Sequence, residues 1–238
     1  DSDGLPLYAD AHTKTFREAV ELLHRNPALQ RAASLRFLPA VGPLHALMLK
    51  AKLSAEHGFR PSENDVRPTD YFTVRFHPNE KGKLQAQIRP LSDGLYPDRP
   101  NGLFLHKKAA KRALDAWARE QQFCPAELNI LPPGYDRNAP CPVAAVGRCQ
   151  GQCGNIGEAA QQRQRIETAA RLLPVADWGK AHQIEICETD TLNGRRLSFH
   201  CAGGALQMPD GSWYFDRKLP AVFKEKFRAH RNDIAVSF

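Results

Sequence analysis

Four cysteines fall within one 30-residue segment of this 238-residue chain, and their side chains could together hold a metal. Cys124 and Cys141 come first, and Cys149 and Cys153 follow eight and twelve positions after Cys141. The residues between them are rich in proline and glycine, which predicts loop. Four thiolates brought together by loops suit either tetrahedral Zn²⁺ or an iron–sulfur cluster. The paired C-x₂-C knuckles of zinc ribbons do not occur among these cysteines, which favours the cluster.

The alternative for these four thiols is that they are small apolar side chains packed in a core, because buried cysteines are common. Cys187 and Cys201 lie in predicted strands, and there we expect a packing role. The chain opens without a signal peptide, so we expect reduced thiols and a cytoplasmic location. It also lacks a run of 18 apolar residues, so we expect no membrane partner.

The charge of the chain favours a polyanionic partner. It carries 33 Lys and Arg against 26 Asp and Glu, a formal net charge of +7. Nucleic acid is the first candidate, although many basic proteins bind none. Four basic residues that open a predicted helix are predicted to contact DNA: Lys107, Lys108, Lys111 and Arg112. The alternative is a solvated charged face, which surface helices require. A second candidate is "FKEKFRAHR" at 223–231, where aromatic and basic residues alternate.

Hydrophobic periodicity predicts helices and strands that would position these groups. The predicted helices cover 15–26, 43–57, 105–123, 158–173 and 221–231. The predicted strands cover 5–8, 34–41, 70–78, 84–91, 183–188, 196–203 and 212–218. The strands at 70–78 and 84–91 form a hairpin around "NEKGK", and the turn-rich residues 92–101 mark a domain boundary.

Two of the helices have apolar faces that predict their burial. In the helix at 43–57, one face presents Leu44, Leu47, Met48, Ala51 and Ala55, and the opposite side presents Leu49 and Leu53. This helix is therefore expected to be buried on both sides. In the helix at 105–123, the residues predicted to face inward are Ala109, Ala113, Leu114, Trp117 and Ala118.

Several segments between residue 5 and about residue 173 resemble one family. "LPLYADA" at 5–11 resembles its "LPLYIGK" strand and turn, and "LHALMLKAKLSAEHGFRPSEN" at 44–64 resembles its "EALLLEANLIKEHRPRYN" helix. "NGLFLHKKAAKRALDAW" at 101–117 resembles its next strand, turn and helix, and "VGRCQGQCG" at 146–154 matches its "GRCxGxC" motif. The family is the N-terminal region of UvrC and of its shorter relative Cho, bacterial incision endonucleases of nucleotide excision repair with a GIY-YIG nuclease domain. The remainder, 174–238, resembles Cho only in length and position.

The resemblance implies a catalytic site whose functional residues are replaced. The tyrosine of the family's second motif falls on Tyr8, its catalytic arginine on Glu18 and its metal-holding glutamate on Lys50. The family's first strand would precede Asp1, which implies that a preceding domain or chain supplies it. The four cysteines are retained, and the resemblance implies that they hold a [4Fe–4S] cluster, with zinc as the alternative.

The replacements reverse the charges that phosphodiester hydrolysis requires, namely a metal that polarises the phosphate and a cation that stabilises developing charge. Mg²⁺ takes oxygen ligands, so the ammonium of Lys50 cannot hold it, and the carboxylate of Glu18 repels phosphate. We therefore expect no endonuclease activity and no catalytic Mg²⁺ or Mn²⁺ in this segment. Glu18 and Lys50 either form an ion pair across the former cleft, or Glu18 closes a capping box while Lys50 points to water.

The sequence thus predicts an α/β or α+β protein of three regions. Residues 1–95 would form a degenerate GIY-YIG-like domain with a small sheet, 96–173 a helix with the four-cysteine region, and 174–238 a small β-rich domain. The resemblance implies a DNA-binding or scaffolding module of a repair protein, within a longer polypeptide that carries a 3′–5′ exonuclease domain before it. The alternatives are an active Cho-like endonuclease with a substituted site, and a metal-stabilised module that binds protein.

Overall fold

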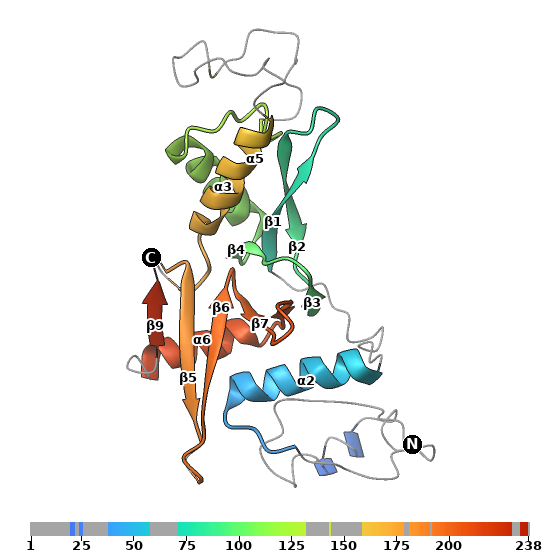
Figure 1. The fold of residues 1–238 in the computed structure, drawn as a ribbon, viewed down its shortest axis with the longest axis vertical. Helices are drawn as coiled ribbons and strands as arrows, with labels where there is room; N and C mark the ends of the chain where they lie inside the picture. The colour runs from blue at the N-terminus through green and yellow to red at the C-terminus, as the bar shows by residue number, and fades with distance from the viewer. Residues whose placement is uncertain are drawn as a thin grey trace.

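A computed structural model of the chain shows two β-sheets, one above the other, each with helices packed against it (Figure 1). It describes residues 20–21, 24–25, 38–57, 71–131, 143, 159–178, 181–190, 192–229 and 234–237. The elements in chain order are α2 (Pro43–His57), β1 (Phe72–Pro78), β2 (Leu84–Pro90), β3 (Gly94–Tyr96), β4 (Asn101–Phe104), α3 (Lys107–Glu120), α5 (Ala159–Ala169), the 3-10 turn η4 (Ala170–Leu172), β5 (Gln183–Thr189), β6 (Arg196–Ala202), β7 (Ala205–Gln207), β8 (Trp213–Phe215), α6 (Leu219–Ala229) and β9 (Ile234–Ser237). The strands of both sheets pair antiparallel, so the fold is α+β.

The first sheet has the strand order β2-β1-β4 and packs against α3 and α5. β1 and β2 form the predicted hairpin, in which Val74 lies opposite Ile88. Strand alternation turns Val74 inward, where it joins a core with Leu114 and Trp117 of α3 and Ile166 of α5. The indole Nε1 of Trp117 donates to Ala169 O at 2.8 Å, so this core also contains a satisfied polar contact between the two helices.

The outer edge of β2 is covered by a side chain and a loop instead of a further strand. Gln162 of α5 accepts a hydrogen bond from Leu84 N at 2.9 Å and donates one to Leu84 O at 3.2 Å. Further along, Ala86 N donates to Leu128 O at 2.9 Å. These bonds satisfy edge groups that would otherwise attract another chain, and they fix α5 to the sheet.

Replacing Gln162 with alanine should lower the free energy of unfolding by about 1–2 kcal/mol, because two partly buried backbone groups lose their partner. Urea unfolding followed by circular dichroism measures this change. The neighbouring Gln161 is exposed, and its replacement with alanine should change stability by less than about 0.5 kcal/mol. Equal effects of the two substitutions would contradict the role given to Gln162.

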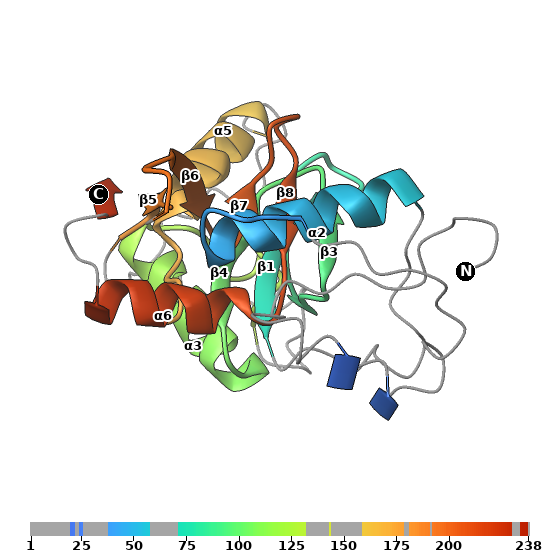
Figure 2. The same ribbon diagram turned by 90° about the horizontal axis from the view of Figure 1, so that it is seen from below.

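The second sheet has the strand order β3-β8-β7-β6-β5-β9. α2 and α6 pack on the same face of it, as the view from below indicates (Figure 2). Ile184 and Ile186 of β5 are turned to that face, where they share a core with Leu44 and Leu47 of α2 and Phe223 of α6. This core fixes the position of α2, the helix that carries Lys50.

The two sheets are joined through β4 and the segment that follows η4. Leu103 N donates to Pro174 O at 3.1 Å, and Ala176 N donates to Leu103 O at 2.9 Å. Gly203, in the turn between β6 and β7, has a φ of +60°, and a Cβ there would lie 1.9 Å from the carbonyl oxygen of Pro100. Only glycine allows this close approach of the two backbones.

The structure confirms most of the predicted elements that it describes, with corrections at particular residues. The strands at 70–78, 84–91, 183–188 and 196–203 and the helices at 43–57, 105–123, 158–173 and 221–231 are present in their described parts with small changes of bounds. The strand predicted at 212–218 is shorter and covers only Trp213–Phe215. The predicted strand 34–41 is wrong for its described part, since residues 38–41 form no strand. Pro39 lacks a backbone N–H for a sheet ladder, and α2 begins directly afterwards.

The burial predicted for the helices also needs correction. α2 is not buried on both sides, because Leu49 and Leu53 are only half-buried. Ala55 is exposed, since the last turn of α2 reaches beyond the strands in Figure 1. In α3 the predicted inward face is confirmed at Leu114, Trp117 and Ala118, but Ala109 is exposed and Ala110 is buried in its place.

The two cores group the segments differently from the three regions of the sequence. Helix α2 packs with the C-terminal strands, whereas the hairpin β1–β2 packs with α3 and α5. β3 lies within residues 92–101, where a boundary was expected, and pairs with β8. The short strands β3, β7 and β9 were not predicted, because three or four residues show too little periodicity. None of the helices in the described ranges is long and apolar enough to cross a bilayer.

Candidate functional site

Lys50, at the position where the resemblance implies the family's metal-holding glutamate, lies in the middle of α2 and forms an ion pair. Its Nζ lies 2.9 Å from Oδ2 of Asp216, a residue directly after β8. The Asp216 side chain is 1% exposed and that of Lys50 is 23% exposed, so the alternative in which Lys50 points to water is wrong. Glu18 lies outside the described residues, and a pair between it and Lys50 therefore stays a prediction.

The Asp216 carboxylate accepts hydrogen bonds from two further donors besides Lys50. The Tyr214 hydroxyl donates to Oδ2 at 3.0 Å, and Lys218 N donates to Oδ1 at 2.9 Å, which caps the start of α6. Burial alone would raise the pKa of Asp216, but the charge of Lys50 and these hydrogen bonds outweigh it, and the pKa lies below its ordinary value. Burial, followed by the charge of Asp216, raises the pKa of Tyr214. Asp216 is therefore a carboxylate, and Tyr214 is a neutral donor to it.

A second buried carboxylate, Glu188 of β5, holds the N-terminus of α2. Its Oε1 and Oε2 accept hydrogen bonds from Leu44 N and His45 N, each at 3.1 Å. Nζ of Lys226, on α6, lies 3.2 Å from Oε1, and the Glu188 side chain is 1% exposed. The first amides of a helix lack intrahelical partners and carry partial positive charge, so a carboxylate stabilises them. Glu188 thus connects β5, α2 and α6.

Gly42 allows this contact. A Cβ at Gly42 would lie 2.5 Å from both Cδ and Oε2 of Glu188, which is closer than side-chain atoms approach one another. The preceding residue is also held, because Val41 N donates to Nδ1 of His45 at 3.0 Å. The chain entering α2 is therefore shaped around the Glu188 carboxylate.

The face of α2 that carries Lys50 therefore joins the helix to the second sheet. Lys50 offers an ammonium, which donates to Asp216 and has no lone pair for a divalent cation. The next carboxylate along the helix, Glu56, is exposed and lies 3.8 Å from the ammonium of Lys52. Among the described residues, no three His, Cys, Asp or Glu side chains gather closely enough to hold a metal ion.

Several predicted site residues lie outside the described residues, namely Tyr8, Glu18, Cys141, Cys149 and Cys153. The four-cysteine centre therefore stays a prediction. Cys124 is half-buried and follows Phe123 after the end of α3, where the loop 124–130 packs against β2. Cys201 is buried in the core of the second sheet, and burial strongly raises the pKa of its thiol, in keeping with a packing role.

The four basic residues predicted to contact DNA are brought together on one surface. All are exposed on the first two turns of α3, whose first turn contains no acidic residue: Lys107, Lys108, Lys111 and Arg112. None of them forms an ion pair with a carboxylate in the described part of the chain. Their positive charges could therefore contact a DNA phosphate backbone, and they equally fit a solvated charged face.

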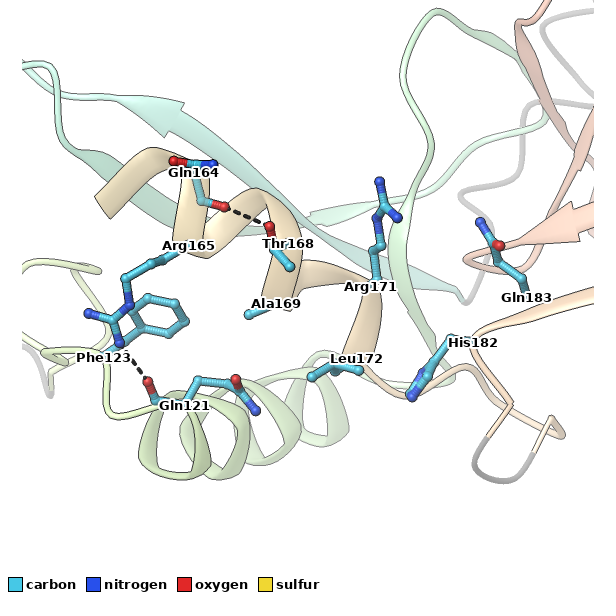
Figure 3. A pocket seen from close by; sticks show the side chains of 10 residues that line it. All are labelled: Gln121, Phe123, Gln164, Arg165, Thr168, Ala169, Arg171, Leu172, His182 and Gln183. Carbon is cyan, nitrogen blue, oxygen red and sulfur yellow. Dashed lines mark hydrogen bonds between the residues drawn. The ribbon is translucent and has the colours of Figure 1, made fainter. Parts of the chain in front are cut away.

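A groove of about 660 Å³ lies at the other end of α3, where the first sheet meets the second (Figure 3). Its lining residues come from the segment directly after α3, from α5 and η4, and from the start of β5: Gln121, Phe123, Gln164, Arg165, Thr168, Ala169, Arg171, Leu172, His182 and Gln183. The guanidinium of Arg165 lies 5.0 Å from the centroid of the Phe123 ring and donates to Gln121 O at 3.1 Å. The groove contains two arginines and a histidine and is lined by no carboxylate.

Sequence reasoning missed Asp216, Glu188 and this groove. Asp216 was missed because it lay within the predicted strand 212–218, whereas in the structure it caps a helix that begins at Leu219, two residues earlier than predicted. For Glu188 the signal was strand alternation, which puts it on the same face as Ile184 and Ile186. The groove had no local signal, because its residues come from segments separated in sequence.

Residues 71–172, which span the first sheet, α3, α5 and η4, match the family described as UvrC/Cho excinuclease, middle domain. The chain is related to the UvrC/Cho-type excinucleases. The excinuclease Cho of Shigella flexneri, that of Escherichia coli O157:H7 and that of Escherichia coli strain K12 are each 26% identical to it over 184 residues. These alignments cover 75% of this chain and 60% of the length of each Cho protein. No solved structure matches the chain.

The matched range places the UvrC/Cho-type middle domain on the first sheet. It contains the basic start of α3, most of the groove, and all four cysteines of the predicted centre. Helix α2 and the strands β5 to β9 lie outside it. The ion pair between Lys50 and Asp216 therefore belongs to the part of the chain that surrounds the middle domain.

Proposed function

We propose that this chain is a DNA-binding module of a DNA-repair protein, derived from a UvrC/Cho-type nuclease and without endonuclease activity of its own. The observation that carries the proposal is the ion pair of Lys50 with the buried Asp216 at 2.9 Å. A nuclease of this type needs an oxygen donor for a divalent metal at that position. Here the position carries an ammonium that holds a helix to a sheet.

DNA binding is supported by charge. The chain carries a net charge of +7, and four exposed cations are clustered at the start of α3. Lysine and arginine side chains that neutralise phosphates release counterions, and this release supplies most of the sequence-independent affinity for DNA. We assign the start of α3 to contacts with the phosphate backbone.

The proposal includes a metal centre on Cys124, Cys141, Cys149 and Cys153, with a [4Fe–4S] cluster preferred to zinc. Four thiolates are a donor set that fits either. When bound, the centre would connect the loop after α3 to the segment before α5 and so stabilise the middle domain. Iron, zinc and sulfide analysis of anaerobically purified protein distinguishes the two, and absence of all three would contradict the centre.

The longer polypeptide proposed around this module carries a 3′–5′ exonuclease domain before it and is cytoplasmic. Its support is the resemblance to an architecture in which a Cho-like part follows such a domain. In this arrangement the exonuclease acts on DNA, and the module described here positions it. Sequencing the complete reading frame tests the arrangement.

The endonuclease proposal is tested by incubating the chain with supercoiled DNA and Mg²⁺ or Mn²⁺, with excinuclease Cho of Escherichia coli as the positive control. We expect no nicking by the wild type and none by Lys50→Glu, because a carboxylate there would face Asp216. Metal-dependent nicking by the wild type would show an active enzyme with a substituted site. Failure to retard any DNA at low salt would instead favour a protein-binding module.

Replacing the four basic residues at the start of α3 with glutamine should weaken duplex binding about tenfold or more. The slope of log affinity against log salt concentration should also decrease in magnitude by about one for each phosphate contact that is lost. Fluorescence anisotropy at several salt concentrations measures both. The control removes the same charge from exposed positions outside both candidate DNA-contact segments, namely Lys52, Lys81, Arg89 and Arg195. Equal losses in the two variants would show that net charge, and not α3, governs binding.

A further inference from the structure

The groove shown in Figure 3 has the chemistry of a site for an anion with a polar, planar part. Arg165, Arg171 and His182 supply cationic or titratable groups, and Gln121, Gln164 and Gln183 supply amides from three elements. Amide groups both donate and accept hydrogen bonds, so they can pair with the edge of a nucleotide base. The guanidinium of Arg165 already lies over an aromatic ring, and guanidinium planes also stack on unpaired bases.

Arg171 is the cation of the groove that is best placed to bind an anion. It is exposed on η4 and forms no ion pair with a carboxylate among the residues that the structure describes. A second guanidinium, that of Arg99, is close enough to interact with it. Burial lowers the pKa of Arg99, and the charge of Arg171 lowers it further. Two like charges in proximity are stabilised by a bound anion such as a phosphate.

The size and lining of the groove favour one strand over a duplex. Its volume of about 660 Å³ lies within the range of small-molecule sites, about 300–1,000 Å³. A duplex keeps its bases paired and stacked, so it cannot place an unstacked base in this groove. An unpaired nucleotide could place its phosphate at Arg171, its base edge at the glutamines, and its sugar or base face on Leu172, which is 42% exposed.

We propose that this groove binds a nucleotide of single-stranded DNA, an inference that rests on the DNA-binding function proposed above. The groove and the basic start of α3 lie at opposite ends of one helix of 14 residues, about 21 Å apart along its axis. A duplex on the start of α3 and an unpaired strand in the groove can therefore be bound at once. The module would then recognise a junction between paired and unpaired DNA.

The test compares Arg171→Gln with Arg89→Gln in fluorescence anisotropy with a labelled oligothymidine of about 12 nucleotides and a duplex of about the same length. Arg89 is an exposed arginine on β2 outside the groove, so the control loses the same charge. Arg171→Gln should weaken single-strand binding about tenfold. It should also reduce the magnitude of the slope of log affinity against log salt concentration by about 0.7. Its duplex affinity, and the single-strand affinity of Arg89→Gln, should change by less than about twofold.

A second variant and a mapping experiment give independent readouts. Gln183→Glu adds a carboxylate to the groove at an exposed position and should weaken single-strand binding in the same direction. Photo-crosslinking of an oligonucleotide with a photoreactive thymine should label a peptide that contains 164–172 or 182–183. Labels only elsewhere, or equal effects of the Arg171 and Arg89 substitutions, would overturn the inference. The inference would also be overturned if Arg171→Gln weakened the binding of poly-glutamate but left the binding of oligothymidine unchanged.

The two proposals fail in different ways. If the chain binds neither duplex nor single strand, the DNA-binding function itself is wrong. If the chain binds duplex through the start of α3 but substitutions of Arg171 and Gln183 leave the affinity for single strands unchanged, only the groove has been assigned incorrectly.

Discussion

Replacing Asp216 with asparagine should lower the free energy of unfolding by about 3 kcal/mol. The substitution removes the negative charge from a side chain that is 1% exposed and that serves Lys50, Tyr214 and Lys218 N. Lys50 would keep its charge in a mostly buried position, and removing one partner of a buried pair costs about 3–5 kcal/mol. We take the lower end because the Lys50 side chain is 23% exposed. Urea unfolding measures the loss.

Asp98→Asn makes the same chemical change at an exposed position and should alter stability by less than about 0.5 kcal/mol. Lys50→Met completes a double-mutant cycle, in which the variant with both substitutions should be more stable than the sum of the two single losses predicts. An additive cycle would mean that the two side chains lie close together without stabilising each other.

The same ion pair should give the protein a particular sensitivity to acid. The pKa of Asp216 lies below its ordinary value of 3.8, so the folded state favours the ionised carboxylate. The stability that Asp216 contributes is therefore fully present above about pH 4. It is lost as the pH falls through the lower pKa that Asp216 has in the folded state. Asp216→Asn should lose less stability between neutral pH and about pH 3 than the wild type does, and equal acid losses would contradict this.

Glu188→Gln should also lower the free energy of unfolding by about 3 kcal/mol, with the loss concentrated in α2. The amide keeps one acceptor oxygen but places a donor against Leu44 N or His45 N, where the carboxylate accepts two bonds. Lys226, whose side chain is 15% exposed, would lose its partner. The partial charge at the start of α2 would also lose its counter-charge.

Two measurements separate this effect from a general loss of packing. Hydrogen exchange should accelerate first at the amides of Leu44 and His45, and limited proteolysis should cut within 38–57 before it cuts α3. Glu185→Gln, on the opposite face of β5, is the matched control and should change stability by less than about 0.5 kcal/mol. Uniform acceleration across both sheets would show that Glu188 does not hold α2 in particular.

The contacts of Lys50 also bear on the proposed absence of endonuclease activity. Lys50→Glu would introduce the residue type that the resemblance implies for this position, but would set it against Asp216, whose Oδ2 lies 2.9 Å from Nζ in the present pair. Two carboxylates at that distance repel each other, and the cost would fall on the attachment of α2. In the structure, this face of α2 joins the helix to the second sheet through Asp216.

The sequence by itself determined the elements whose signal is local. The alternation in β1 and β2, the apolar stripe of α3 and the periodicity of α5 predicted those elements, because each pattern lies within a short window. The basic start of α3 was equally visible, since four cations within two turns of a helix share a surface. The cysteine spacing gave a metal centre that remains a prediction.

Only the tertiary structure decided what Lys50 does. Its partner Asp216 lies 166 residues away in sequence, and Glu188 lies 144 residues from the amide of Leu44. Contacts over such separations depend on which face of the second sheet covers α2 and on the register of β5 and β8, and no short window contains that information. The groove has the same origin, because α3, α5 and β5 bring its residues together only after the two sheets have packed.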